Sequence, residues 1–136
     1  MTPERILVVD DEAAVRGIVS ALLERSGYAT TVAESAAEAL NLLREQPAFD
    51  LVLSDIMMPG TDGLSLLDQI CTDFPETPVV MCTAVQDVHV TTNAFRRGAI
   101  DYLLKRLVFG LESLHRQEFY VYGHQIFFEF GILGSE

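Results

Sequence analysis

The sequence predicts an α/β fold in which a parallel sheet carries helices on both faces. Short apolar runs alternate with segments of helical periodicity over the first hundred residues. Strands that alternate with amphipathic helices form βαβ units, and right-handed crossovers place the helices on both sides of the sheet. The chain has 136 residues, 49% of them hydrophobic, which is enough for one domain with a buried core and leaves little room for a second.

Five short runs predict the strands of this sheet. The first and the third are continuous apolar sequences that end in aspartate, as is typical of strands buried on both faces. In chain order the strands span residues 5–10, 28–32, 50–55, 78–83 and 100–104.

Three segments between these strands predict helices with a clear apolar stripe. The first carries its apolar residues within 15–23 and ends at Ser26-Gly27. The second covers 36–43, with Ser35 placed to cap its N-terminus. The third has its stripe within 64–74.

The fourth helix, residues 87–97, is predicted to be held more loosely. Its convincing core candidates are Val88, Ala94 and Phe95, and Gly98 ends it. A sparse apolar stripe means that little free energy of burial holds the helix to the sheet.

Composition excludes several classes of protein. Nine Lys and Arg residues against twenty Asp and Glu residues give a formal net charge of −11. Nucleic-acid backbones and anionic lipids both require a basic surface, so we expect neither as a partner. No apolar run approaches the roughly 20 residues of a membrane helix, and Met1–Asp10 does not resemble a secretion signal. We therefore expect a cytoplasmic protein in which Cys71 and Cys82 are reduced and buried.

Polar side chains follow four of the predicted strands. They are Asp10, Asp11, Asp55, Thr83 and Lys105. In an open parallel sheet the ligand crevice lies at the carboxyl ends of the strands. Clustered carboxylates suit a hard cation such as Mg²⁺, Thr and Lys suit phosphoryl oxygens, and an aspartate beside the cation is a credible nucleophile. The arrangement predicts phosphoryl transfer to a carboxylate.

Each of these residues also has a simpler interpretation. Asp10 or Asp11 could serve merely as the N-cap of the first helix. Thr83 could be an ordinary strand-end hydroxyl, and Lys105 could be a solvated charge. The functional hypothesis depends on all four strand ends supplying compatible groups.

Four motifs in the right order resemble the receiver domain of two-component response regulators. They are 8–12 (VVDDE), 55–63 (DIMMPGTDG), 82–84 (CTA) and 98–105 (GAIDYLLK), within a match from about residue 4 to 105. The resemblance implies a flavodoxin-like, doubly wound five-stranded sheet of order 2-1-3-4-5, consistent with the periodicity.

The resemblance also implies a role for each acidic residue. Asp55 would be the phosphoacceptor, and its phosphoryl donor would be a phosphohistidine on a sensor histidine kinase or phosphotransfer protein. Asp10 and Asp11 would bind Mg²⁺ together with Asp55 and the main-chain carbonyl of Met57.

Further roles follow for the residues around the acceptor. Thr83 and Lys105 would bind the phosphoryl oxygens, and Tyr102 would be the aromatic residue whose rotamer follows Thr83. Pro59 and Gly63 would shape the loop after the acceptor, with glycine tolerating a positive φ.

The chain departs from the family pattern after the lysine. The family usually has proline there and a cis bond, whereas this chain has Arg106. A cis bond without proline costs about 3–4 kcal/mol, so we predict a trans Lys105-Arg106 bond. Beyond it, Leu107, Leu111 and Leu114 could form one face of a fifth helix.

Two functions are therefore compatible with the sequence. The first is a phosphoacceptor receiver that switches conformation, with at most self-catalysed phosphotransfer and dephosphorylation. The alternative is a receiver-like interaction module whose altered Lys105-Arg106 loop no longer switches. An aspartate-dependent phosphatase ranks third, because Met57 stands where a second acid would act two residues after Asp55.

The C-terminal segment departs from the family pattern. We divide the chain into a receiver domain, 1–118, and an atypical tail, 119–136. Ten of the fifteen residues in 119–133 are apolar, and six of these are aromatic. A surface patch of that size is unusual on a soluble monomer, so we expect the tail to be buried against protein.

The sequence of the tail predicts that it forms two strands and that it joins two copies of the chain in a dimer. Residues 119–122 and 125–130 favour strands joined by Gly123-His124, a pair compatible with a type II′ turn, and a continuous helix is the alternative. A short isolated hairpin is marginal in water, which favours pairing with a second copy over folding back on its own domain.

Overall fold

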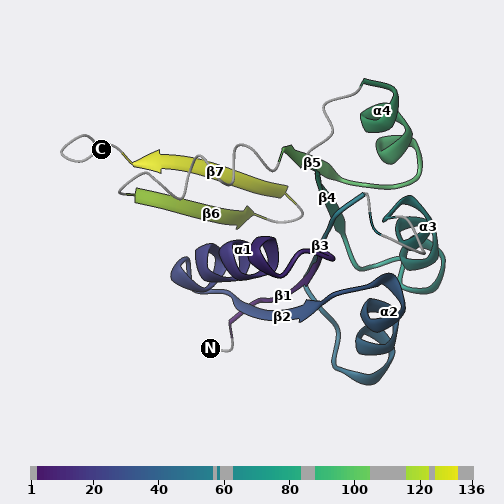
Figure 1. Cartoon of the computed structure of the whole chain (residues 1–136), viewed down its shortest axis with the longest axis horizontal. Helices are drawn as coiled ribbons and strands as arrows, with labels where there is room; N and C mark the ends of the chain where they lie inside the picture. The colour runs from purple at the N-terminus through teal and green to yellow at the C-terminus, as the bar shows by residue number, and fades with distance from the viewer. Residues whose placement is uncertain are drawn as a thin grey trace.

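The computed structural model describes residues 3–56, 58, 63–83, 88–104, 116–122 and 125–131 (Figure 1). Five parallel strands form one sheet in the order β2-β1-β3-β4-β5, which confirms the predicted fold and strand order. The strands are β1 (Arg5–Val9), β2 (Ala29–Ala33), β3 (Leu51–Ser54), β4 (Val79–Thr83) and β5 (Asp101–Leu104). The helices are α1 (Ala13–Arg25), α2 (Ala36–Glu45), α3 (Gly63–Asp73) and α4 (Val88–Arg96).

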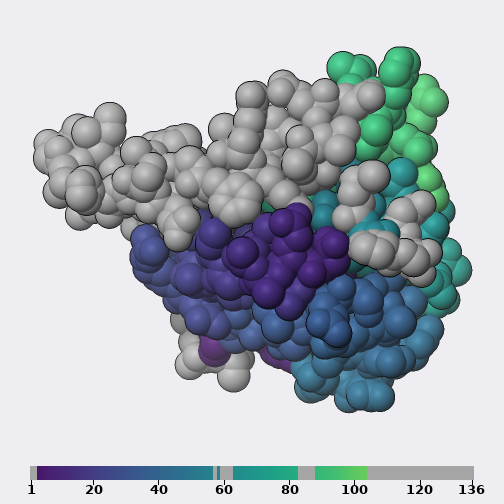
Figure 2. Space-filling model, viewed as in Figure 1, coloured from purple at the N-terminus to yellow at the C-terminus, as the bar shows by residue number. Residues whose placement is uncertain are grey.

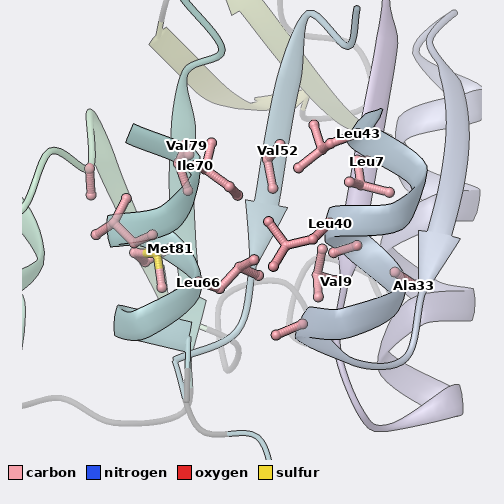
Figure 3. Close-up of a cluster of buried hydrophobic side chains, with 14 of the residues drawn as sticks. Leu7, Val9, Ala33, Leu40, Leu43, Val52, Leu66, Ile70, Val79 and Met81 are labelled. Atoms are coloured by element: carbon pink, nitrogen blue, oxygen red, sulfur yellow. The ribbon is translucent and has the colours of Figure 1, made fainter. Parts of the chain in front are cut away.

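Buried side chains form two clusters, one on each face of the sheet. Alternate residues of a strand point to opposite faces, so one apolar strand feeds both clusters. Leu7 and Val9 of β1 join the cluster under α2 and α3, whereas Ile6 and Val8 join the cluster under α1. Figure 3 shows the first cluster, in which Leu40 and Leu66 reach across from their helices toward the strands. The neighbouring strands β1 and β3 are thus buried on both faces of the sheet.

Capping defines the start of α2. The hydroxyl of Ser35 accepts the N–H of Glu38 at 3.1 Å, and the carboxylate of Glu38 accepts the N–H of Glu34 at 3.3 Å. The first bond satisfies an N–H group that the first turn leaves without a helical partner, and the second ties the residue before the N-cap to the same turn. The prediction that Ser35 is the N-cap is confirmed.

The two predicted helix ends at glycine are also confirmed. Gly27 follows α1 with φ of +96° and Gly98 follows α4 with φ of +111°. Both angles lie in the left-handed region that glycine reaches without a steric penalty.

Helix α4 is less buried than its sequence predicted. Ala94 is its one buried residue, whereas Val88 is 78% and Phe95 is 45% exposed. The prediction that Val88 and Phe95 belong to the core is wrong. Figure 2 shows the green region that contains α4 at the outer edge of the molecule in this view.

One cysteine also differs from expectation. Neither cysteine forms a disulfide, and Cys82 is buried, but Cys71 is only partly buried on α3. Burial, followed by the charge of nearby Asp68, raises the pKa of the Cys71 thiol. A raised pKa keeps the thiol protonated at neutral pH and lowers its reactivity.

The tail forms an antiparallel hairpin of two strands. β6 (Arg116–Tyr122) pairs with β7 (Gln125–Gly131), from Arg116 opposite Gly131 to Tyr122 opposite Gln125. This outcome confirms strands over a continuous helix, although β6 begins three residues before Phe119. β6 lies beside α1 of the same chain (Figure 1). The turn at 123–124 and the predicted fifth helix, within 105–115, lie outside the described residues.

Candidate functional site

Three carboxylates meet at the carboxyl ends of β1 and β3. These strands are neighbours, with Val9 opposite Ser54, so the residues that follow them emerge side by side. One carboxylate oxygen from each of Asp10, Asp11 and Asp55 lies within 4.8 Å of the other two. The predicted convergence of these acids is what the structure shows.

Main-chain hydrogen bonds extend the sheet by one residue at each of these strand ends. The N–H of Asp10 donates to Ala33 at 3.1 Å, and the N–H of Asp55 donates to Val9 at 2.9 Å. Asp10 and Asp55 are each only 3% exposed, whereas Asp11 is exposed to solvent. Two of the three acids are thus anchored to rigid backbone inside the protein.

Asp10 is also the residue that leads into α1. One of its carboxylate oxygens accepts the N–H of Glu12 at 2.8 Å, and Glu12 occupies the N-cap position of the helix. The N-cap is therefore Glu12, whose side chain makes no capping bond, and the interpretation of Asp10 or Asp11 as the N-cap is wrong. The bond from Glu12 instead holds the carboxylate of Asp10 beside the start of α1, within the acidic cluster.

The cluster has the composition of a site for a hard divalent cation. Its three ligands are all carboxylate oxygens, with no His or Cys among them. Carboxylates this close repel one another, and a cation held between them relieves that repulsion. Two buried acids plus one exposed acid leave a side of the cluster open to water or to a second ligand.

Two further predicted site residues belong to the adjoining strands. Thr83 is the last residue of β4, next to β3, and pairs with Leu104 at the end of β5. Tyr102 of β5 is partly buried, packs against the core cluster under α2 and α3, and pairs with Met81. The strand order therefore brings Thr83 to the same edge of the sheet as the acids.

Three residues with predicted roles cannot be compared with the structure. Met57, proposed as a carbonyl ligand, Pro59 of the loop after the acceptor, and Lys105, which follows Leu104, lie outside the described residues. The trans Lys105-Arg106 bond likewise stays a prediction.

Residues 6–116 match the response regulator receiver domain family. The chain belongs to this family. A receiver domain is a signalling domain, and the acids found here stand at the ends of the first and third strands of its sheet.

Curated relatives resemble this chain over about three quarters of its length. The DNA-binding transcriptional regulator NtrC of Escherichia coli K12 is 41% identical over 100 residues, which are 74% of this chain and 21% of NtrC. Transcriptional regulatory protein ZraR of the same strain is 43% identical over 104 residues, which are 76% of this chain and 23% of ZraR. The chain thus spans about a fifth of the length of these relatives.

Solved receiver structures share the fold. The receiver domain of NtrX from Brucella abortus is 38% identical with a TM-score of 0.70, covering 79% of this chain and 94% of that one. A response regulator receiver domain protein from Clostridium thermocellum is 32% identical with a TM-score of 0.71, covering 75% of this chain and 82% of that one.

No helix within the described residues is long and apolar enough to span a membrane.

Sequence reasoning missed one cation near the receiver's acids. Arg16 of α1 donates from Nη1 to the main-chain oxygen of Asp10 at 2.7 Å. Its side chain ties the first turn of α1 to the end of β1. The sequence did contain a signal for this residue, because Arg16 is the sole Lys or Arg between residues 6 and 24 and therefore the one cation close in sequence to Asp10 and Asp11.

Gly63 was assigned for the wrong reason. Sequence reasoning expected glycine for a positive φ, but Gly63 does not lie in the left-handed region. It begins α3, is buried, and its N–H donates to the main-chain oxygen of Ile56 at 2.7 Å. The requirement for glycine here is space, since a β-carbon would overlap the carbonyl oxygen of Asp55.

Proposed function

We propose that this receiver domain accepts a phosphoryl group on Asp55 from a phosphohistidine of a sensor histidine kinase or phosphotransfer protein. The observation that supports this function is the cluster of Asp55 with Asp10 and Asp11 at the carboxyl edge of the sheet. An acceptor carboxylate must stay ionised while an anionic group approaches it, and a cation among these acids provides that condition.

In the proposed transfer, a carboxylate oxygen of Asp55 attacks phosphorus. The phosphorus–nitrogen bond breaks, its electron pair returns to the imidazole of the donor, and an aspartyl phosphate forms. Bound Mg²⁺ supplies positive charge that screens the acids and the transferring group. Asp10, Asp11 and Asp55 would hold it, with the main-chain carbonyl of Met57 as a further ligand.

The main-chain bonds at the strand ends serve this step directly. Because the N–H groups of Asp10 and Asp55 are tied into the sheet, the nucleophile and its neighbouring ligand do not reorganise as charge builds up. Thr83 would donate its hydroxyl to one phosphoryl oxygen, and Lys105 would pair with another.

The same site would drive the switch. Phosphorylation adds negative charge and strong acceptors at the end of β3. Thr83 would move toward them, and Tyr102 would turn into the space that it leaves. Helix α4 suits this response, because Ala94 is its one buried residue and little packing must be broken to move it.

Its role is a signalling one with a limited chemical repertoire. We propose that catalysis goes no further than self-catalysed phosphotransfer and hydrolysis of the aspartyl phosphate. Kinases of this type present their phosphohistidine inside the cell, so the cytoplasm is the proposed location.

Intact-mass analysis after incubation with acetyl phosphate and Mg²⁺ tests the phosphoacceptor. The wild-type chain should gain the mass of one phosphoryl group, and chelation of Mg²⁺ should prevent the gain. Asp55→Asn should show no gain, while Asp73→Asn at the exposed end of α3 serves as the matched control and should react normally. An unchanged adduct on Asp55→Asn would refute the assignment. A wild-type chain that takes no phosphoryl group would favour the interaction module instead.

We also propose a homodimer formed through the tail. The ten apolar residues of 119–133 make a surface larger than soluble monomers usually expose. β6 lies beside α1 of its own chain, and we propose that a second copy covers apolar residues of the same hairpin. Sedimentation of the whole chain and of a chain ending at His115, just before β6, tests this proposal. A dimer that becomes a folded monomer on truncation supports it, whereas a monomer in both cases refutes it.

A further inference from the structure

The start of α3 makes unusually close contact with the backbone of the phosphoacceptor. A β-carbon at position 63 would overlap the carbonyl oxygen of Asp55 and would lie 2.7 Å from Cα of Ile56 and 2.8 Å from the carbonyl carbon of Asp55. Real β-carbons essentially never approach other heavy atoms within 3.0 Å. Only glycine allows α3 to begin where it does.

The atoms in the way belong to the main chain. A side chain can often rotate away from a new neighbour, but the carbonyl of Asp55 moves only if the end of β3 moves. The hydroxyl of Ser54 donates to this same carbonyl oxygen at 3.0 Å in the buried interior. The N–H of Gly63 donates to Ile56 at 2.7 Å. A side chain at position 63 therefore has to displace α3, the acceptor strand, or both.

The other described glycines differ from Gly63 in what requires them. Gly27 and Gly98 adopt positive φ, a conformational requirement that Gly63 does not have. A β-carbon at Gly98 would also lie 2.6 Å from Sγ of Cys71, but that atom belongs to a side chain and not to the main chain. Gly17, inside α1, has no atom within 4 Å of where a β-carbon would stand. Position 63 thus requires glycine because it lies so close to the main chain of Asp55, and not because of its own backbone angles.

We propose that Gly63 is a positioning residue for phosphorylation, an inference that rests on the proposed function of Asp55. The close approach of α3 holds the end of β3 so that the carboxylate of Asp55 lies among those of Asp10 and Asp11. A side chain at position 63 would separate Asp55 from these two acids, weakening the cation site and slowing attack on phosphorus. Misplacement of a reacting group by about 1 Å costs on the order of 100-fold in rate.

Gly63→Ala is the test variant, and Gly17→Ala is its matched control, since both change glycine to alanine within a helix. Three quantities are measured for each: the Mg²⁺ dissociation constant by calorimetry, the rate of phosphorylation by acetyl phosphate, and thermal unfolding in EDTA. We expect Gly63→Ala to unfold cooperatively but to bind Mg²⁺ at least about tenfold more weakly and to react about 100-fold more slowly. Gly17→Ala should match the wild type in Mg²⁺ affinity and rate.

The readouts separate failure of this inference from failure of the proposed function. If the wild type takes no phosphoryl group, the proposed function fails, and Mg²⁺ affinity alone still tests Gly63. If Gly63→Ala binds Mg²⁺ and reacts as the wild type does, the inference is overturned.

A second measurement covers a Gly63→Ala chain that does not fold. In the ¹⁵N-labelled wild type, the amide resonance of Gly63 should shift on Mg²⁺ titration with the dissociation constant found by calorimetry, while that of Gly17 stays fixed. A Gly63 resonance that does not respond would overturn the inference.

Discussion

Helices α2 and α4 contribute to the same core cluster but differ greatly in how much holds them there. α2 has ten residues and buries four of them, at positions 36, 39, 40 and 43, and Ser35 caps its first turn. α4 has nine residues and buries one, Ala94. Since burial supplies most of the free energy that holds a helix to a sheet, the two helices should differ in local stability. The structure thus combines a firmly packed helix beside β1 with a loosely held one whose buried Ala94 belongs to the cluster against which Tyr102 packs.

The largest expected effect is on the buried face of α2. Leu40→Ala should lower the free energy of unfolding by about 2–4 kcal/mol, because it removes buried methyl groups and leaves a cavity. Leu42→Ala, a partly buried leucine on the same helix, should cost clearly less. Urea denaturation of both variants measures the difference, and equal losses would contradict the burial of α2 described here.

The cap of α2 should contribute less than its core. Ser35→Ala should lower the free energy of unfolding by about 1 kcal/mol, because the N–H of Glu38 loses its acceptor. Ser35→Asp keeps an acceptor at this position and should restore most of the loss. A loss that Ser35→Asp does not restore would show that the hydroxyl acts in another way.

A smaller effect is expected where the end of α4 is tied to α3. Arg97 pairs through two nitrogens with the carboxylate of Asp68, whose side chain is 50% exposed. A double-mutant cycle with Arg97→Ala and Asp68→Ala should give a coupling of about 0.2–1 kcal/mol that decreases with added salt. Coupling well above this range would mean that the pair holds α4 more firmly than its burial indicates.

The same ion pair sets a direction for pH dependence. The hydrogen bond from Arg97 lowers the pKa of Asp68 below its ordinary value of 3.8. A depressed folded-state pKa stabilises the protein at pH above the unfolded-state value, and this contribution is lost as pH falls through the folded-state pKa. The coupling should therefore be complete at pH 6 and should decrease on acidification below about pH 4.

The smallest effect is expected at the exposed start of α4. Val88→Ala should change the free energy of unfolding by no more than about 0.5 kcal/mol, because the side chain is already 78% exposed. Amide hydrogen exchange should also be faster in α4 than in α2. Comparable protection in the two helices would remove the structural basis for a movable α4.

Much of the fold and site could be predicted because the deciding signals are local. An apolar run that ends in aspartate marks both a buried strand and its carboxyl end, as at Asp10 and Asp55. Parallel pairing then brings those ends together, whatever the intervening helices are. Ser35 was predictable for the same reason, because capping involves residues only three apart.

The errors at α4 arose where helical spacing was treated as burial. Val88 and Phe95 have the spacing of a core stripe, but how much of a helix is covered depends on its neighbours in space. The burial of Cys71 on α3 was also overestimated, because its place in an apolar stripe does not show how much protein covers it. Periodicity shows which side of a helix faces the protein and does not show how much protein lies there.

The sequence by itself determined the order of strands and helices and the three acids at the edge of the sheet, since each depends on residues close together in the chain. Only the tertiary structure decided that α4 is exposed, that the hairpin lies beside α1, and why position 63 is glycine. Local sequence can indicate a glycine that needs an unusual φ, but it cannot show the main-chain carbonyl of Asp55 lying against Gly63. That contact exists only after β3 and α3 have come together, and the distance between them excludes a side chain.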